Sequence, residues 1–139
     1  MKANDAIKVM RDMVNALNSE NYKKVEACFT DDLEYDDVPM GKVYHGIKEF
    51  MDYVKKIHFR NPDHKWELTS VFSDGHMIAS ESVSSGTFTR SDDPAMPADG
   101  KYGSVRCASI TKLRDGKIFT NADYYDLFAI IQQHSPPKP

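Results

Sequence analysis

The acidic residue best placed for chemistry is Asp123, near the end of an alternating stretch over residues 117–125. Side chains two apart on a strand share a face, so Asp123 is expected beside Phe119, Asn121 and Tyr125. A carboxyl group among aromatic side chains is desolvated, which raises its pKa toward the range that supports acid/base catalysis. An ordinary solvated acid at a strand end is the alternative, and the pattern alone leaves both open.

A second pair of acids, Asp36 and Asp37, stands just before Pro39. Adjacent side chains of an extended segment point in opposite directions, so one of the two can point inward. We expect Asp37 to share a cavity with Asp123, and two carboxylates in one low-dielectric site do not both ionise readily. This hypothesis makes the more enclosed Asp123 the acid and Asp37, nearer to a turn and to water, the base. The alternative is that Asp37 only caps a turn.

Composition excludes several classes of protein. The 139 residues include 18 basic and 21 acidic side chains, and the net charge of −3 argues against an electrostatic nucleic-acid binder. No apolar run approaches the roughly 20 residues of a membrane-spanning helix. Cys28 and Cys107 form no CxxC pair, and the five histidines lack zinc-binding spacing. We expect a cytoplasmic protein with no metal site and no cofactor, and with neither nucleic acid nor membrane as a partner.

The order of elements indicates the fold class. Apolar side chains recur at helical spacing over residues 7–17, 22–29 and 47–57, and the period changes to two near residue 64. Strands are predicted over 33–38, 64–72, 77–90, 101–114 and 117–125, with a closing helix over 127–132. Asp-Gly pairs at 74–75 and 115–116 are hairpin signals. The pattern predicts one α+β domain over 1–134, a mobile loop over 91–100 and a flexible Pro-rich tail over 135–139.

Three stretches together resemble the SnoaL-like branch of the nuclear transport factor 2-like superfamily. They are Tyr35-Asp36-Asp37-Val38-Pro39-Met40 with Tyr44-His45-Gly46-Ile47-Lys48-Glu49-Phe50, then Gly86-Thr87-Phe88, then residues 113–118 running into 121–127. With their order and spacing, the resemblance covers nearly the whole chain, about residues 5–133. The resemblance implies a cone-shaped, strongly curved antiparallel sheet wrapped around the N-terminal helices, with a mostly apolar internal pocket. It also implies a homodimer formed through the sheets.

Members of this superfamily differ in activity, and the chain matches their sites in part. It resembles limonene epoxide hydrolases at Tyr35 and Asp123, while Asp37 stands where they have an Asn and Ser82 and Ser84 replace their Arg-x-Asp pair. It resembles SnoaL-like polyketide cyclases at Asp123, although residues 101–114 contain no histidine. Asp37 also falls near the general base of ketosteroid isomerases, whose oxyanion donors correspond to Met13 and to Ala108 or Ser109.

Two classes of function follow from these residues. One is an enzyme acting on an apolar oxygenated molecule by cyclisation, isomerisation, dehydration or hydrolysis, with Asp123, Asp37 and Tyr35 as catalytic residues. The other is a binding or association module that turns over no ligand. In either class a small apolar ligand would contact a further set of side chains, with helix residues closing the floor. These are Trp66, Asn121, Met40, Phe88, Tyr125, Met13 and Phe50.

Overall fold

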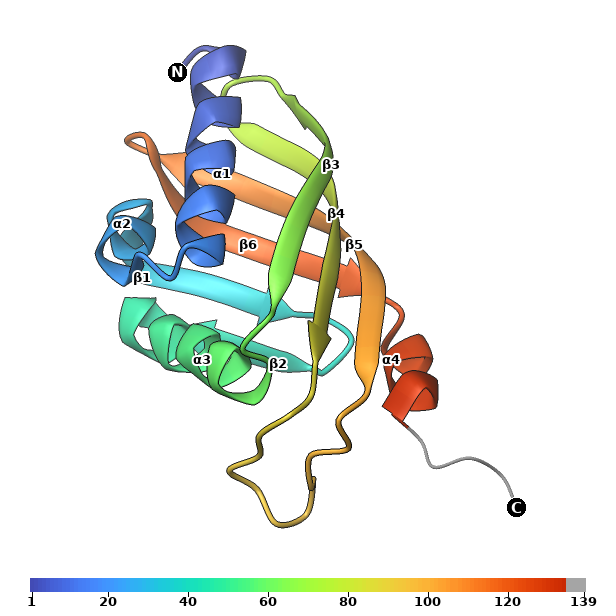
Figure 1. Cartoon of the computed structure of the whole chain (residues 1–139). Helices are drawn as coiled ribbons and strands as arrows, with labels where there is room; N and C mark the ends of the chain where they lie inside the picture. Colours follow the sequence, from blue (N-terminus) through green and yellow to red (C-terminus); the bar gives the residue numbers. More distant parts are fainter. Residues whose placement is uncertain (135–139) are drawn as a thin grey trace.

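A computed structural model describes residues 1–134 as helices packed against one six-stranded sheet (Figure 1). Within these residues no helix is both long and apolar enough to cross a membrane. The elements in chain order are α1 (Ala3–Asn18), α2 (Tyr22–Ala27), β1 (Phe29–Asp37), β2 (Lys42–His45), α3 (Gly46–Arg60), β3 (Lys65–Ser73), β4 (Met77–Thr87), β5 (Tyr102–Arg114), β6 (Lys117–Tyr125) and α4 (Leu127–His134).

The α+β prediction is confirmed, with one correction to the sheet. The strand order is β2-β1-β6-β5-β4-β3, and every neighbouring pair is antiparallel except β1 and β6, which run parallel. The sheet is therefore mixed and not wholly antiparallel. The parallel pair arises because the last strand of the meander returns beside the first strand in the same direction. The short strand β2 and the early start of β1 at Phe29 were not predicted.

The helices cover the side of the sheet that curves around them in Figure 1. α1 packs against β3 and α3 packs against β1, so the strands between them are left partly uncovered. The amphipathic pattern explains this placement, because α1 buries Ala6, Met10, Val14 and Leu17 along one stripe. Fully buried residues such as Leu33 of β1 and Ile118 of β6 complete the core beneath the helices.

Two β-bulges change which side chains face the interior. In β3, the register with β4 shifts between Leu68 and Ser70. In β6, the register with β5 shifts between Ile118, which pairs with Leu113, and Thr120, which pairs with Lys112. A bulge inserts one residue, so the alternation of faces reverses beyond it.

The alternation-based expectations for two phenylalanines are wrong for this reason. Phe119 was predicted on the face of Asp123, but it lies under the guanidinium of Arg114, 5.2 Å from its ring centroid. Ile118 takes the interior position instead. Strict alternation along β3 would likewise place Phe72 on the face of Trp66, yet Phe72 is 70% exposed.

The turns follow the glycine signals, while the long loop has no regular structure. Asp115 and Gly116 both have positive φ, at 52° and 76°, as a two-residue hairpin between β5 and β6 requires. Residues 88–101 form no helix or strand, so the irregular segment includes the loop predicted over 91–100 but begins and ends outside it, because both flanking strands are shorter than predicted. The mobility of this loop and the single domain over 1–134 stay predictions, and the expected tail over 135–139 lies outside the described residues.

Replacement of Ile78 by Ala should lower the free energy of unfolding by about 2–5 kcal/mol, the usual cost of a large core truncation. Ile78 is 0% exposed and packs with Ala6, Met10 and Val14 of α1. Urea denaturation followed by circular dichroism measures the change. Phe72→Ala is the matched control, and its exposed side chain predicts a change within about 0.5 kcal/mol. Equal losses in the two variants would contradict the bulge in β3.

Candidate functional site

A cavity of about 710 Å³ opens between the helices and the concave face of the sheet. Nine of the predicted site residues line it. They come from five helices and strands and from the segments after β1 and β4. These are Met13, Tyr35, Met40, Phe50, Trp66, Phe88, Asn121, Asp123 and Tyr125. Asp37 is the predicted residue that does not line it. Most of the wall is apolar, so the few polar groups that point inward determine what the cavity can do chemically.

The carboxylate of Asp123 is the centre of the polar network. Its Oδ1 accepts hydrogen bonds from Ser109 Oγ at 2.6 Å and from Asn121 Nδ2 at 2.8 Å, and its Oδ2 accepts one from the hydroxyl of Tyr35. Asn121 is itself held by Thr111, whose buried Oγ1 donates to Asn121 Oδ1 at 2.6 Å. Every member of the network is thus fixed by at least one strand neighbour.

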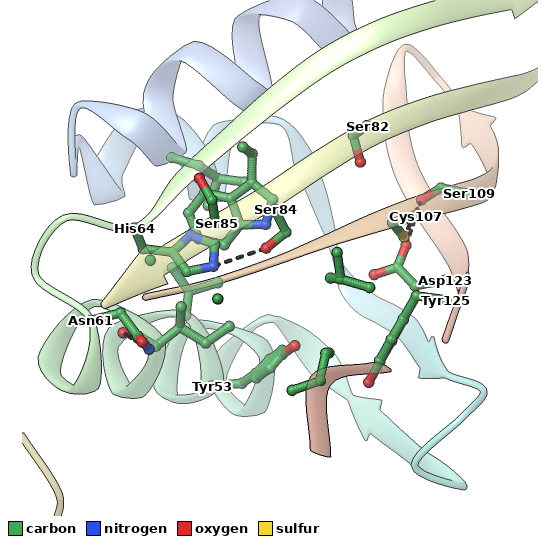
Figure 2. A pocket seen from close by; sticks show the side chains of 18 of the residues that line it. Tyr53, Asn61, His64, Ser82, Ser84, Ser85, Cys107, Ser109, Asp123 and Tyr125 are labelled. Atoms are coloured by element: carbon green, nitrogen blue, oxygen red, sulfur yellow. Dashed lines mark hydrogen bonds between the residues drawn. The ribbon is translucent and has the colours of Figure 1, made fainter. Parts of the chain in front are cut away.

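Strand register explains why these side chains meet. Ser109 of β5 lies directly opposite Asp123 of β6, and Tyr35 of β1 lies opposite Asn121. Since β1 is parallel to β6, Tyr35 reaches Asp123 diagonally across the pair. Three adjacent strands therefore supply the donors, and Figure 2 shows Ser109 and Asp123 joined at one side of the pocket.

Burial dominates the electrostatics of this group. Desolvation raises the pKa of Asp123 above the ordinary value for Asp, although the hydrogen bonds from Ser109, Tyr35 and Asn121 lower it in part. Burial and the neighbouring Asp123 raise the pKa of the Tyr35 hydroxyl well above 10, so Tyr35 remains a neutral donor at pH 7. Burial also raises the pKa of the Cys107 thiol to about 11, which leaves it uncharged.

Asp37 is placed differently from the expectation. It is only 5% exposed, so the idea that it stands near water is wrong. Its Oδ1 accepts a hydrogen bond of 2.6 Å from the hydroxyl of Tyr125, and its backbone lies opposite Asp123 on the parallel strand. The carboxylate is buried because the alternation of β1 turns Leu33, Tyr35 and Asp37 to the same interior side. Asp37 thus reaches the cavity only through Tyr125, which lines it.

Sequence reasoning missed a row of hydroxyl groups along one wall. Ser80, Ser82 and Ser84 of β4 line the cavity together with Ser109. The signal was present as serines at every second position over 80–84, which places them on one face of a strand. His64 was also missed: its Nε2 lies 2.9 Å from Ser84 Oγ, and its ring centroid lies 3.9 Å from that of Trp66.

The arrangement is suited to proton transfer. It offers a half-buried, desolvated carboxylate, a neutral phenol and hydroxyl groups inside a mostly apolar cavity, which are the parts of a general acid/base site. Arg60 also lines the cavity, but its Nε donates to Asp92 Oδ1 at 3.0 Å. Among residues 1–134 no group of three or more His, Cys, Asp or Glu side chains could hold a metal ion.

Solved structures share this fold at low sequence identity. A protein proposed to be a SnoaL-like polyketide cyclase, from Jannaschia sp. CCS1, superposes with a TM-score of 0.85 at 13% identity, covering 98% of this chain and 95% of the other. A protein proposed to be a polyketide cyclase, from Silicibacter sp. TM1040, gives 0.82 at 22%, with 98% and 99% covered. An LEH-like epoxide hydrolase from M. tuberculosis gives 0.76 at 18%, with 94% and 90% covered. At such identities the likeness shows the fold alone.

Sequence comparison adds the family. No curated protein sequence matches the chain significantly. A family model described as the SnoaL-like domain matches residues 10–121, a span that includes Tyr35, Asn121 and most of the cavity wall. Together with the cone-shaped fold and its cavity, this match identifies the chain as a member of the SnoaL-like domain family.

Proposed function

We propose that this protein is an enzyme that moves a proton within an apolar, oxygenated substrate held in the cavity, with Asp123 as its acid/base group. The observation that supports the proposal most is the Asp123 network. A carboxylate with three donors and a raised pKa lines a mostly apolar cavity large enough for a small molecule. Such a group combines the basicity and the orientation that proton transfer requires.

Asp123 acts first as a base in this proposal. Its two oxygens already accept three hydrogen bonds, an arrangement that suits the ionised carboxylate. The substrate proton moves to Oδ2, and the hydroxyl of Tyr35 then turns its hydrogen from Oδ2 toward the substrate oxygen that has gained charge. Return of the proton from Asp123 to another substrate atom completes an isomerisation or a cyclisation, and its return to a leaving hydroxyl completes a dehydration.

Asp37 assists from behind the cavity wall. Its hydrogen bond from Tyr125 fixes the orientation of that phenol, and its charge raises the pKa of Asp123 further. This replaces the expectation that Asp37 is itself the base. Hydrolysis is the least supported of the four reactions, because Ser82 and Ser84 stand where the epoxide hydrolases that the sequence resembles have an Arg-x-Asp pair.

A second candidate is a small-ligand-binding module without turnover, which could also associate as a homodimer. The three hydrogen bonds that Asp123 accepts within the protein favour this candidate, because a carboxylate that only completes a structural network needs no substrate. Large apolar side chains outside the cavity, such as Phe72, Ile110 and Tyr124, are exposed and suit an association surface. The effect on turnover of removing the Asp123 carboxyl group distinguishes the two candidates.

Replacement of Asp123 by Asn keeps size and hydrogen bonding but removes titration. Turnover should fall by about 10²–10⁴-fold, as expected for the loss of a general acid/base. The assay is hydrogen–deuterium exchange and product formation, followed by NMR in D₂O, on a panel of enones, β-keto esters and epoxides. Asp36→Asn is the matched control, because it removes an acid of the neighbouring strand β1 that does not line the cavity. Equal turnover in wild type and Asp123→Asn, with folding preserved, would assign the protein to the binding class.

The pH dependence follows from the direction of the Asp123 pKa. Since the ionised form is the base, kcat/KM should be constant at neutral pH and should fall as the pH drops through the raised pKa of Asp123. The inflection in the kcat/KM profile should therefore lie above the ordinary carboxyl value of about 3.9. A profile that keeps full activity down to about pH 4 would show that the reaction does not use this carboxylate as its base.

A further inference from the structure

A second polar group lies in the cavity away from Asp123. In Figure 2, His64, Ser84, Ser85 and Asn61 gather on one side of the pocket, and Asp123 with Ser109 stands on the other. Strand register agrees with the picture. Ser80 lies opposite Ser109, which lies opposite Asp123, and Ser84 is four residues further along β4. At about 3.3 Å per residue, Ser84 is roughly 13 Å along the strand from the Asp123 row.

The histidine of this second group is uncharged. Burial, and to a lesser extent the neighbouring His58, lower the pKa of His64 to about 4. The ring lies tilted against Trp66, and its Nε2 is 2.9 Å from Ser84 Oγ, whereas its Nδ1 is buried without a partner among residues 1–134. A neutral imidazole carries one N–H and one lone pair, so one of the two functions must remain unpaired at Nδ1.

Hydrogen-bond chemistry selects the tautomer. A buried N–H without an acceptor is rarer in proteins than an acceptor with an unused lone pair. Nδ1 therefore carries the lone pair, and the Nε2–H donates to Ser84 Oγ. Among the described residues His64 is the hydrogen-bond partner of that oxygen. The hydroxyl hydrogen of Ser84 is then left without an acceptor in the protein, on a residue that lines the cavity.

We infer that His64 and Ser84 form a subsite that binds a neutral carbonyl oxygen of the ligand, with the Ser84 hydroxyl as donor and His64 as the residue that orients it. A neutral acceptor fits this subsite better than a carboxylate, because a buried carboxylate needs a cationic partner. The guanidinium of Arg60 at this end of the cavity is already paired with Asp92, with Nη2 2.9 Å from Oδ1. The inference rests on the proposed function for its substrate class. The substrate would be an elongated apolar molecule that reacts beside Asp123 and carries a ketone, aldehyde or ester carbonyl displaced by on the order of 13 Å along the strand direction, the four-residue offset along β4.

The tautomer can be tested without any ligand. The ¹⁵N NMR spectrum of the His64 ring, assigned by its loss in His64→Phe, should show a protonated Nε2 and an unprotonated Nδ1 at pH 7. The opposite tautomer would make Ser84 the donor to His64, which would leave no hydroxyl hydrogen for a ligand and would overturn the inference.

The subsite itself is tested with a ketone probe. 4-Acetylbiphenyl labelled with ¹³C at its carbonyl should bind the wild-type protein with a downfield shift of the carbonyl resonance. Ser84→Ala should abolish that shift and weaken binding by roughly 2- to 10-fold, the contribution of one hydrogen bond. Ser82→Ala is the matched control, because it removes the hydroxyl two residues away on the same face, and it should retain the shift. 4-Ethylbiphenyl, which lacks the carbonyl, should bind equally to wild type and Ser84→Ala.

The outcomes separate this inference from the proposed function. If Asp123→Asn rather than Ser84→Ala abolishes the carbonyl shift, the ketone binds at the Asp123 end and the subsite is refuted. Failure of 4-acetylbiphenyl to bind, or tighter binding of biphenyl-4-carboxylate, would also overturn it. A shift that depends on Ser84 together with unchanged turnover in Asp123→Asn would retain the subsite and reject the acid/base role.

Discussion

The structure depends on the need to place donors around one desolvated carboxylate, that of Asp123. A carboxylate that leaves water must be hydrogen-bonded, because an unpaired charge in an apolar interior is strongly destabilising. Asp123 meets this requirement with Tyr35 from β1, Ser109 from β5 and Asn121 from β6. Because the donors come from three adjacent strands, the same bonds that satisfy the charge also join β1 to the strands of the meander.

The parallel pairing of β1 and β6 is what makes this arrangement possible. It sets Asp37 beside Asp123 and Tyr35 beside Asn121. Each phenol then reaches a carboxylate of the other strand, with Tyr35 donating to Asp123 and Tyr125 donating to Asp37. The two Tyr–Asp pairs differ in their access to the cavity, because Asp123 lines it and Asp37 does not. Two chemically alike pairs are therefore suited to two tasks, one to proton transfer and one to orientation.

The sequence predicted the parts of the fold that depend on local pattern. The amphipathic stripes of α1 and α3 and the Asp115-Gly116 turn lie where their spacing indicated. The sequence-based prediction was wrong where a single inserted residue reversed which side chains face the interior. The bulges in β3 and β6 carry no glycine or proline signal, so strict alternation places Phe72 and Phe119 on the interior face although neither lines the cavity.

The candidate site was predictable to a similar extent. Asp123, Asn121 and Tyr35 could be placed from alternation and from the family resemblance, and they do meet in one network. Ser109 and Ser84 were overlooked as functional groups because a serine on a strand is ordinary, and only the pairing partners give it a role. The burial of Asp37 depends on the pairing of β1 with β6, which are about 90 residues apart in the sequence. Local sequence patterns do not indicate such a distant pairing.

The measurement that tests the account most directly is the ¹³C NMR titration of the Asp123 carboxyl carbon in the ligand-free protein, assigned by its loss in Asp123→Asn. The account holds that burial outweighs the three hydrogen bonds, so the carboxyl should titrate above the ordinary value of about 3.9. A second titration in Tyr35→Phe should move the midpoint further upward, because one donor to the ionised form is lost. A midpoint at or below the ordinary value in the wild-type protein would show a carboxylate stabilised as a structural anion, and would contradict its role as an acid/base group.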